Sequence, residues 1–440
     1  MWNIFGVGLC YIFALRYFGR RIASIGTLLF ATCGAAVNYS RFIWQPNYLP
    51  PLLVLWAITL YAGCVQGRRR WFVGHATILL LAILLHSVVA LLIPVTGVAV
   101  ALAPQRPRLV EYGAVALIAL VLAAPTLIWE AISNGYDARA LYHSALHGGQ
   151  IDLQVIRSLY AVLGAPGAGD FGPTALYAQL SLAYTPLNIA AALIFALGYL
   201  ALTLRIARPA LAIWRTNPDV THTHVQSGAS VSSSPTFAAV YAKATPRERP
   251  GLAWRWLRAV YHGLRADAPW RAELLLWLWV TTPVVLLLRH SAPPQVHYLL
   301  VLFPGVFLTS AFAAVDVPHW LGRLRPPQRT TPGTTPRWAA LAVSAAITLL
   351  LIAQAGQSAV YVTSLADTSF TALAGYGYPL SELETADQAM TALQHANGAA
   401  NVEIITPTAA RYRDPLDYLL VSEHSTRVSL TANCLLLPAA

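Results

Sequence analysis

The segment 68–108 reads RRRWFVGHATILLLAILLHSVVALLIPVTGVAVALAPQRPR. Its 33 central residues, 71–103, carry no acidic or basic side chain apart from two histidines, and arginines lie on both flanks. A single helix of this length would measure about 50 Å, which exceeds the thickness of one bilayer core. Arginine-rich loops stay in the cytoplasm, so two basic flanks require an even number of crossings. The segment therefore predicts a tight helical hairpin that turns outside the cell near His86 and Ser87.

The same alternation of apolar segments and basic gaps runs along the whole chain. Of the 29 Lys and Arg residues, 22 lie in five gaps, which are 16–21, 68–70, 106–108, 205–271 and 323–337. Because the gaps between these hold few basic residues, alternate gaps are expected on opposite sides of a membrane. Apolar segments are predicted to cross at 2–16, 22–38, 49–66, 72–86, 88–103, 110–130, 184–204, 272–288, 298–315 and 338–357.

The composition agrees with a membrane protein. Of 440 residues, 57% are hydrophobic and 11% are charged, and the mean hydropathy is +0.55. A water-soluble chain of this length needs far more charge to cover its surface. The net charge of +11 comes mostly from the basic gaps, which suit an anionic inner leaflet, so nucleic-acid binding is not expected. The four cysteines form no disulfide framework.

The predicted fold class is an all-α polytopic membrane bundle of about ten transmembrane helices, with a small extracytoplasmic α/β domain at the C-terminus. Residues 1–357 form the transmembrane part. Within it, 131–183 is an outer loop with surface helices, and 205–271 is a cytoplasmic loop. That cytoplasmic loop contains a Ser- and Gly-rich stretch at 225–235, which is expected to be disordered, and an amphipathic helix at 250–268 suited to the inner membrane surface.

The C-terminal part, 358–440, is more polar than the rest of the chain. An amphipathic helix is predicted at 381–395, and strands are predicted at 402–405 and 428–437. The chain begins within an apolar helix and stops within an apolar, strand-like run. We therefore expect both ends to be cut and the α/β domain to be incomplete.

A short outer turn holds the strongest candidate site. Residues 289–298 read RHSAPPQVHY, which places Arg289, His297 and Tyr298 between two apolar segments. Charge-assisted hydrogen bonds from such groups to a lipid-linked phosphate are strong in a low dielectric. The alternative is interfacial anchoring, since aromatic and basic side chains mark membrane boundaries in general.

Two further candidates lie at the same predicted face. Arg41 belongs to the segment 38–50, NYSRFIWQPNYLP, where an arginine can hold a phosphate through two hydrogen bonds. His86 lies at the apex of the predicted hairpin, where it would present a polar tip to a substrate. For both residues the alternative is again a helix-end anchor at the interface.

Two other pairs of residues are better explained by ordinary structural roles than by catalysis or metal binding. Glu130 and Asp137 could act as a base or as metal ligands, but two solvated loop acids are the simpler interpretation. His143 and His147 have the i, i+4 spacing of metal ligands on a helix, yet no third ligand is evident. The sequence thus predicts no metal site and identifies no catalytic base.

Four local features, in this order along the chain, resemble the bacterial C-type (GT-C) membrane glycosyltransferases. The similarity is to the group that contains protein O-mannosyltransferases and lipid A aminoarabinose transferases. The features are the helix pair around 16–21 that leads to Arg41, the hairpin with His86, the segment HYLLVLFPGVFL at 297–308, and a soluble tail after the last apolar segment.

The resemblance implies an inverting enzyme of the bacterial cytoplasmic membrane. Such an enzyme takes a sugar from a polyprenyl-phosphate donor and transfers it, at the outer face, to a lipid, glycan or protein acceptor. It implies that the substrate is bound by Arg41, His86, Arg289, His297 and Tyr298. The family's acidic base lies in a first outer loop that has no counterpart here, so it is expected upstream of Met1, in a longer chain. A divalent cation, Mg²⁺ or Mn²⁺, is the one cofactor left open.

Two alternatives compete with the enzyme. A transporter or flippase of a lipid-linked glycan should place charged or broken-helix sites at mid-membrane depth, whereas the polar groups here gather at the outer boundary. A non-catalytic scaffold is the other alternative. The enzyme hypothesis predicts a cavity lined by Arg41, His86 and His297.

Overall fold

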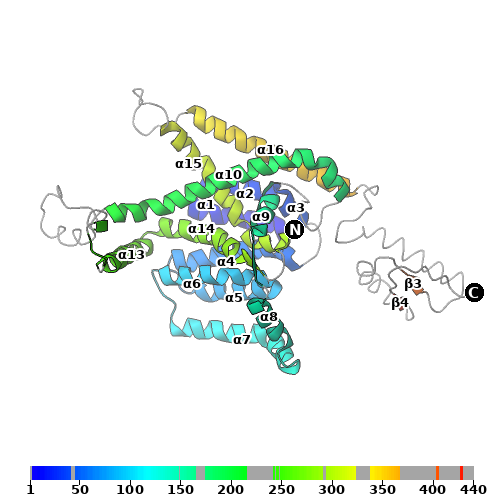
Figure 1. Ribbon diagram of the computed structural model, residues 1–440, viewed down its shortest axis with the longest axis horizontal. Coiled ribbons are helices and arrows are strands. Elements are labelled where there is room, and N and C mark those ends of the chain that lie inside the picture. Colours follow the sequence, from blue (N-terminus) through cyan, green and yellow to red (C-terminus); the bar gives the residue numbers. More distant parts are fainter. Residues whose placement is uncertain are drawn as a thin grey trace, which may run out of the picture. The chain divides into compact units, whose positions relative to one another are not determined.

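The computed structural model of the chain describes residues 2–40, 45–147, 149–164, 174–215, 241–242, 244–246, 248–290, 294–323, 337–366, 403–405 and 427–429. The fold is mostly helical (Figure 1). The chain divides into two compact units. One comprises Met1–Gly169 with Ala183–Ala359 and contains the helix bundle. The other comprises Asp170–Leu182 with Val360–Ala440.

Each of the ten apolar segments predicted from the sequence is helical. In chain order they are α1 (Trp2–Phe18); α2 (Arg20–Thr32) with α3 (Gly34–Tyr39); η1 (Gln45–Tyr48), α4 (Leu49–Leu60) and η2 (Tyr61–Val65); α5 (Trp71–Leu85); η3 (Ser87–Leu92) with α6 (Ile93–Leu102); α7 (Leu109–Ile132); α10 (Thr174–Arg215); α14 (Ala268–Leu287); η4 (Val296–Leu302) with α15 (Gly305–Arg323); and α16 (Arg337–Ala366). The helices α8 (Tyr136–His147), α9 (Gln154–Gly164) and α13 (Arg249–Ala266) lie between them.

Five of the described helices are long and apolar enough to cross a membrane, and they indicate a multi-pass membrane protein. They span Gln45–Val65, Leu109–Ile132, Thr185–Arg215, Ala268–Leu287 and Trp338–Val360. A sixth is obtained if η4 and α15, which meet at an angle of 59°, count as one span. The number is below the predicted ten because several helices are short. α1, α5 and the η3–α6 pair are shorter apolar helices, and α2 is separated from α3 by the extended backbone of Cys33.

The predicted break near His86 is confirmed. α5 ends at Leu85, His86 adopts an extended conformation with φ −156° and ψ 117°, and η3 begins at the next residue. The two arms of the hairpin are joined by a hydrogen bond of 3.1 Å between His75 Nε2 on α5 and Thr96 Oγ1 on α6. A buried histidine needs such a partner, because an unpaired polar group in an apolar environment is costly.

Small residues allow the central helices to approach each other closely. α2 packs between α1 and α15, and a Cβ atom added to Gly26 of α2 would lie only 3.0 Å from the Cα of Leu308 on α15. On the other side of α15, a Cβ at Gly198 of α10 would overlap the carbonyl oxygen of Thr309. Close backbone approach of this kind is a main source of helix packing in lipid, where burial of apolar surface gives little driving force.

Four of the predicted basic gaps meet at one end of the bundle, which we call the basic end. It is defined by contacts among residues from 16–21, 65–70, 104–111 and 261–271. These contacts are Arg16 Nη2 to Gln66 Oε1 at 2.9 Å, Arg69 Nε to Glu111 Oε1 at 4.0 Å, Arg106 Nη2 to the Tyr261 hydroxyl at 3.2 Å, and Arg271 Nη2 to the Val65 carbonyl at 2.8 Å. Because the basic gaps are all expected on one side of the membrane, they are predicted to lie near one another.

An ion network that the sequence did not indicate joins three helices. Arg205 on α10 forms ion pairs of 2.8 Å with Glu273 on α14 and 2.8 Å with Asp316 on α15. The guanidinium also lies over the ring of Phe312, 5.3 Å from its centroid. Two carboxylates thus share one cation, and the network ties α10, α14 and α15 together.

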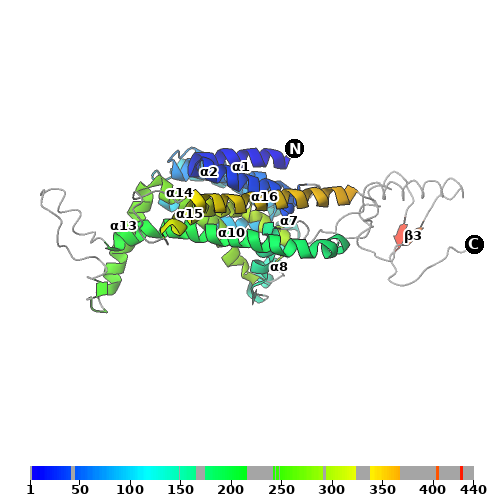
Figure 2. The ribbon, with the colours of Figure 1, turned by 90° about the horizontal axis from the view of Figure 1, so that it is seen from above.

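The connecting segments agree with the sequence in part, since α10 extends beyond the predicted span 184–204 into both neighbouring loops. The surface helices predicted within 131–183 are α8 and α9, and the predicted amphipathic helix is α13, which runs crosswise to α10 (Figure 2). In the second unit, β3 (Glu403–Ile405) pairs in parallel with β4 (Arg427–Ser429). The stretch 225–235 and the helix at 381–395 lie outside the described residues.

Candidate functional site

Three of the predicted site residues come together in what we call the ring cluster, formed by His86, His297 and Tyr298. The ring centroids of His86 and His297 are 5.6 Å apart, and those of His86 and Tyr298 are 5.7 Å apart. The His297 and Tyr298 rings lie 4.5 Å apart and nearly perpendicular. All three side chains are half-buried. The turn of the hairpin therefore meets the start of η4.

Local backbone structure fixes both sides of the cluster. The Nδ1 atom of His86 accepts a hydrogen bond of 3.3 Å from the Val88 amide and caps η3. Because an accepting nitrogen carries no proton, the neutral imidazole bears its proton on Nε2, which is left as a donor. On the other side, η4 is held in place by its fully buried residues 299–302.

Arg289 belongs to a separate local structure. It forms β2 (Arg289–His290), which pairs antiparallel with β1 (Gln150–Ile151) in the register Ile151 to Arg289. The side chain of Arg289 is exposed, and Gly149 lies directly against it, since a Cβ there would be 2.6 Å from the Arg289 Nε. The neighbouring His290 Nε2 lies 3.5 Å from Asp152 Oδ2. The position of Arg289 is thus set by strand pairing with β1. Arg41 lies outside the described residues.

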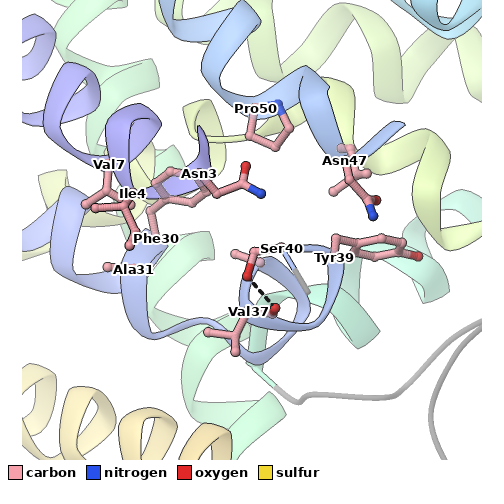
Figure 3. Close-up of a pocket in the computed structure, with 12 residues that line it drawn as sticks. Asn3, Ile4, Val7, Phe30, Ala31, Val37, Tyr39, Ser40, Asn47 and Pro50 are labelled. Atoms are coloured by element: carbon pink, nitrogen blue, oxygen red, sulfur yellow. Dashed lines mark hydrogen bonds between the residues drawn. The ribbon is translucent and has the colours of Figure 1, made fainter. Parts of the chain in front are cut away.

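A cavity of about 380 Å³ lies next to η4, among the ends of α1, α2, α3, η1 and α4 (Figure 3). Figure 3 shows Ile4, Val7, Phe30 and Ala31 gathered on one side and Tyr39 and Asn47 on the other. The wall is therefore mostly apolar, with a few polar side chains such as Asn47. Its lining residues are Asn3, Ile4, Val7, Phe30, Ala31, Ala36, Val37, Tyr39, Ser40, Asn47, Pro50 and Leu300.

The cavity and the ring cluster are linked through η4. His297 and Leu300 are three residues apart, and in a 3₁₀ helix such residues share a face about 6 Å apart along the axis. The sequence predicted a cavity lined by Arg41, His86 and His297. That prediction stays untested, because Arg41 lies outside the described residues. The cavity described here is lined by Leu300 of η4 and by α1 to α4.

Glu130 and Asp137 serve the structure of the α7–α8 corner. The Glu130 Oε2 atom accepts a hydrogen bond of 3.3 Å from the Ala138 amide, and the Asp137 Oδ2 atom accepts one of 3.0 Å from Trp129 Nε1. Each carboxylate therefore ties one helix to the other. Within the described ranges, no group of three or more His, Cys, Asp or Glu side chains could hold a metal ion. The side chain of His147 lies outside the described residues.

Sequence reasoning missed the polar residues of the cavity. Asn47 falls within the segment 38–50 that the sequence analysis singled out, so its place between two prolines was an available signal. Asn3 carried no such signal, since it is one polar residue near the start of an apolar helix. The contact between His290 and Asp152 joins distant parts of the chain and could not be read from spacing.

No protein-family model, no curated protein and no solved structure matches this chain.

Proposed function

We propose that the protein is an inverting membrane glycosyltransferase that takes a sugar from a polyprenyl-phosphate donor and transfers it to a lipid, glycan or protein acceptor. The observation that carries the proposal is the ring cluster near a mostly apolar cavity, to which η4 links it. Binding sites for small molecules are mostly apolar concavities with a few polar groups, and this cavity falls within their usual range of volume.

The proposed topology follows the distribution of charge. α5 begins beside the basic residues 68–70 and ends at Leu85, directly before His86, so the ring cluster lies one helix length from the basic end. With the basic end in the cytoplasm, the cluster and the cavity face the outside of a bacterial cytoplasmic membrane. The short apolar helices α1, α5 and η3–α6, together with the α2–α3 pair, complete about ten crossings in this proposal. Residues 358–440 form its extracytoplasmic α/β domain.

The proposed sugar transfer uses few side chains of the protein. In an inverting transfer, the acceptor hydroxyl attacks the anomeric carbon as the bond from that carbon to the phosphate oxygen breaks, and the polyprenyl phosphate leaves. The His86 Nε2–H group and His297 would hold the departing phosphate by hydrogen bonds, which are stronger to a charged acceptor. The apolar wall of the cavity suits the isoprenoid chain. We assign no described residue as the base that accepts the hydroxyl proton, and no step uses a metal ion.

The direct test measures turnover of polyprenyl-phosphate-linked sugars by the full-length protein in lipid bilayers. We expect His297→Ala to lower the rate roughly 100-fold, the loss typical of removing one donor to a developing charge. His262→Ala is the matched control, since His262 is exposed on α13 near the basic end. Absence of turnover by the wild-type protein, or equal rates for both variants, would contradict the proposal.

A transporter of a lipid-linked glycan is the second candidate function. It is favoured by the 59° bend between η4 and α15. Broken helices mark transport sites in membranes. A flippase should move a fluorescent lipid-linked glycan across vesicles without cleaving it. Sugar transfer without movement of intact donor would exclude this candidate.

A further inference from the structure

α13 carries a surface that sugar transfer at the other end of the bundle does not use. The helix contains four arginines, at positions 249, 255, 258 and 265, and no acidic residue. It lies at the basic end, directly before α14, from which it is separated by Asp267 alone. Asp267 caps α14 by accepting a hydrogen bond of 2.9 Å from the Trp270 amide. α13 is therefore held next to the start of the apolar helix α14.

One face of α13 is packed firmly onto the bundle. Leu264 is buried in a cluster with Leu102 of α6 and Trp270 of α14, and Val260 packs against the same cluster. The indole of Trp256 donates a hydrogen bond of 3.1 Å to the Ala210 carbonyl on α10. These contacts hold α13 crosswise to α10, as Figure 2 shows. A helix fixed in this way lies along the plane in which the apolar helices end.

The remaining surface combines exposed apolar groups with arginines. Trp254 and Leu257 are 68% and 49% exposed, although both are large and apolar. At 100° per residue, they occupy a flank between the packed face and an arc that holds Arg258 and Arg265. The Arg265 Nη2 atom donates a hydrogen bond of 3.2 Å to the Pro104 carbonyl, which holds that side chain at the end of α6.

We propose that α13 is an interfacial helix that binds the phosphate headgroups of anionic phospholipids. Trp254 and Leu257 enter the boundary between headgroups and acyl chains, and Arg258 and Arg265 pair with the phosphates above them. Two observations support lipid as the occupant. The arginine arc has the complementary charge, and α13 packs through Leu264 and Val260 onto α6 and α14, which are apolar helices. Helices that carry apolar residues on one face and basic residues on another lie in the membrane interface.

The proposal is tested on the full chain in lipid nanodiscs, without any assay of turnover. A spin label is attached at Leu257→Cys in a Cys434→Ser chain, where Cys10, Cys33 and Cys64 are buried and do not compete for the label. The label should be reached by oxygen in preference to a water-soluble nickel chelate. It should move deeper as phosphatidylglycerol replaces phosphatidylcholine. A label at His262→Cys, on the arginine arc, should stay at headgroup depth.

The arginines are tested by titration with phosphatidylglycerol. The mole fraction that gives half of the depth change should rise about fivefold for each arginine removed, in Arg258→Gln and in Arg258→Gln/Arg265→Gln. Arg139→Gln/Arg157→Gln, with two exposed arginines on α8 and α9, is the matched control and should leave the titration unchanged. Three results would each overturn the proposal. The first is preferential access of the nickel chelate to position 257. The second is shielding of that position from both reagents, as a protein or RNA partner would cause. The third is a label depth that changes neither with lipid charge nor in the arginine variants.

Discussion

The polar side chains at the two ends of the helix bundle differ in their burial and in the groups they contact. At the basic end, the guanidinium of Arg271 is 2% exposed and donates hydrogen bonds to the carbonyls of Leu264, Arg265 and Val65 at 2.6, 2.7 and 2.8 Å. At the other end, His86, His297 and Tyr298 are half-buried, and they contact one another through their rings. The cation at the basic end is enclosed by the fold, whereas the ring cluster keeps polar atoms near a cavity.

This difference indicates where stability and ligand binding are concentrated. A buried cation with several carbonyl partners fixes the ends of helices, and its loss leaves those carbonyls without a donor. A half-buried histidine that uses one ring nitrogen as a helix cap still has a donor to offer. Substitutions at the basic end should therefore lower stability, and substitutions in the ring cluster should lower activity while leaving stability nearly unchanged.

The largest effect is expected for Arg271→Met. Three carbonyl groups lose a charged donor, which should cost about 4 kcal/mol of stability at the values usual for charge-assisted hydrogen bonds. The measurement is the unfolding midpoint of the detergent-purified protein by intrinsic fluorescence. Arg208→Met is the matched control, since Arg208 is exposed on α10 and should change the midpoint little. Equal midpoints for the two variants would refute the enclosed role of Arg271.

The next effect concerns the ring cluster. His86→Ala removes the proposed Nε2–H donor to the departing phosphate, and the rate of sugar transfer should fall roughly 100-fold. Unfolding should shift by less than in Arg271→Met, because only the cap of η3 is lost. Comparing rate and midpoint in the same preparations separates the two roles. A variant that unfolds early but turns over normally would reverse the contrast between the ends.

A smaller effect is expected in the ion network. Arg205→Met leaves Glu273 and Asp316 facing each other, at a cost of about 2 kcal/mol, below the value for fully buried pairs because the Arg205 side chain is 32% exposed. Asp316→Asn should cost less, since Arg205 retains Glu273. Thermal unfolding at low and high salt provides the measurement. If Asp316→Asn proves the more damaging substitution, the shared-cation arrangement is wrong.

The smallest effect is expected for Tyr261→Phe. The Tyr261 hydroxyl donates to the Ala101 carbonyl at 3.0 Å and accepts from Arg106 at 3.2 Å, so it joins α13 to the end of α6. These contacts are exposed to solvent, and their loss should cost about 0.5–1 kcal/mol. Hydrogen exchange of the α13 amides should rise, whereas Tyr142→Phe, at a side chain that is 63% exposed on α8, should leave α13 unaffected. Unchanged exchange in Tyr261→Phe would show that packing alone holds α13.

The parts of the fold that could be predicted depend on local properties of the chain. The ten helical segments and the break at His86 follow from apolar runs of defined length between basic gaps. The presence of α13 between two apolar helices follows from its amphipathic helical periodicity. The juxtaposition of His86 with His297 and Tyr298 was proposed only as a shared face, and their ring contacts depend on how η3 meets η4.

The amino-acid sequence by itself determined which segments are helical and which gaps gather at the basic end, because length and charge act locally and through the membrane. Only the tertiary structure decided which helices lie inside. α7 and α4 are both strongly apolar helices, yet none of the residues of α7 is buried, whereas most of α4 is enclosed. Lipid and protein interior are equally apolar, so hydrophobicity does not distinguish a lipid-facing helix from a central one. For the same reason, the cavity beside η4 and the sharing of Arg205 by two carboxylates arise from helix packing, which apolar periodicity does not encode.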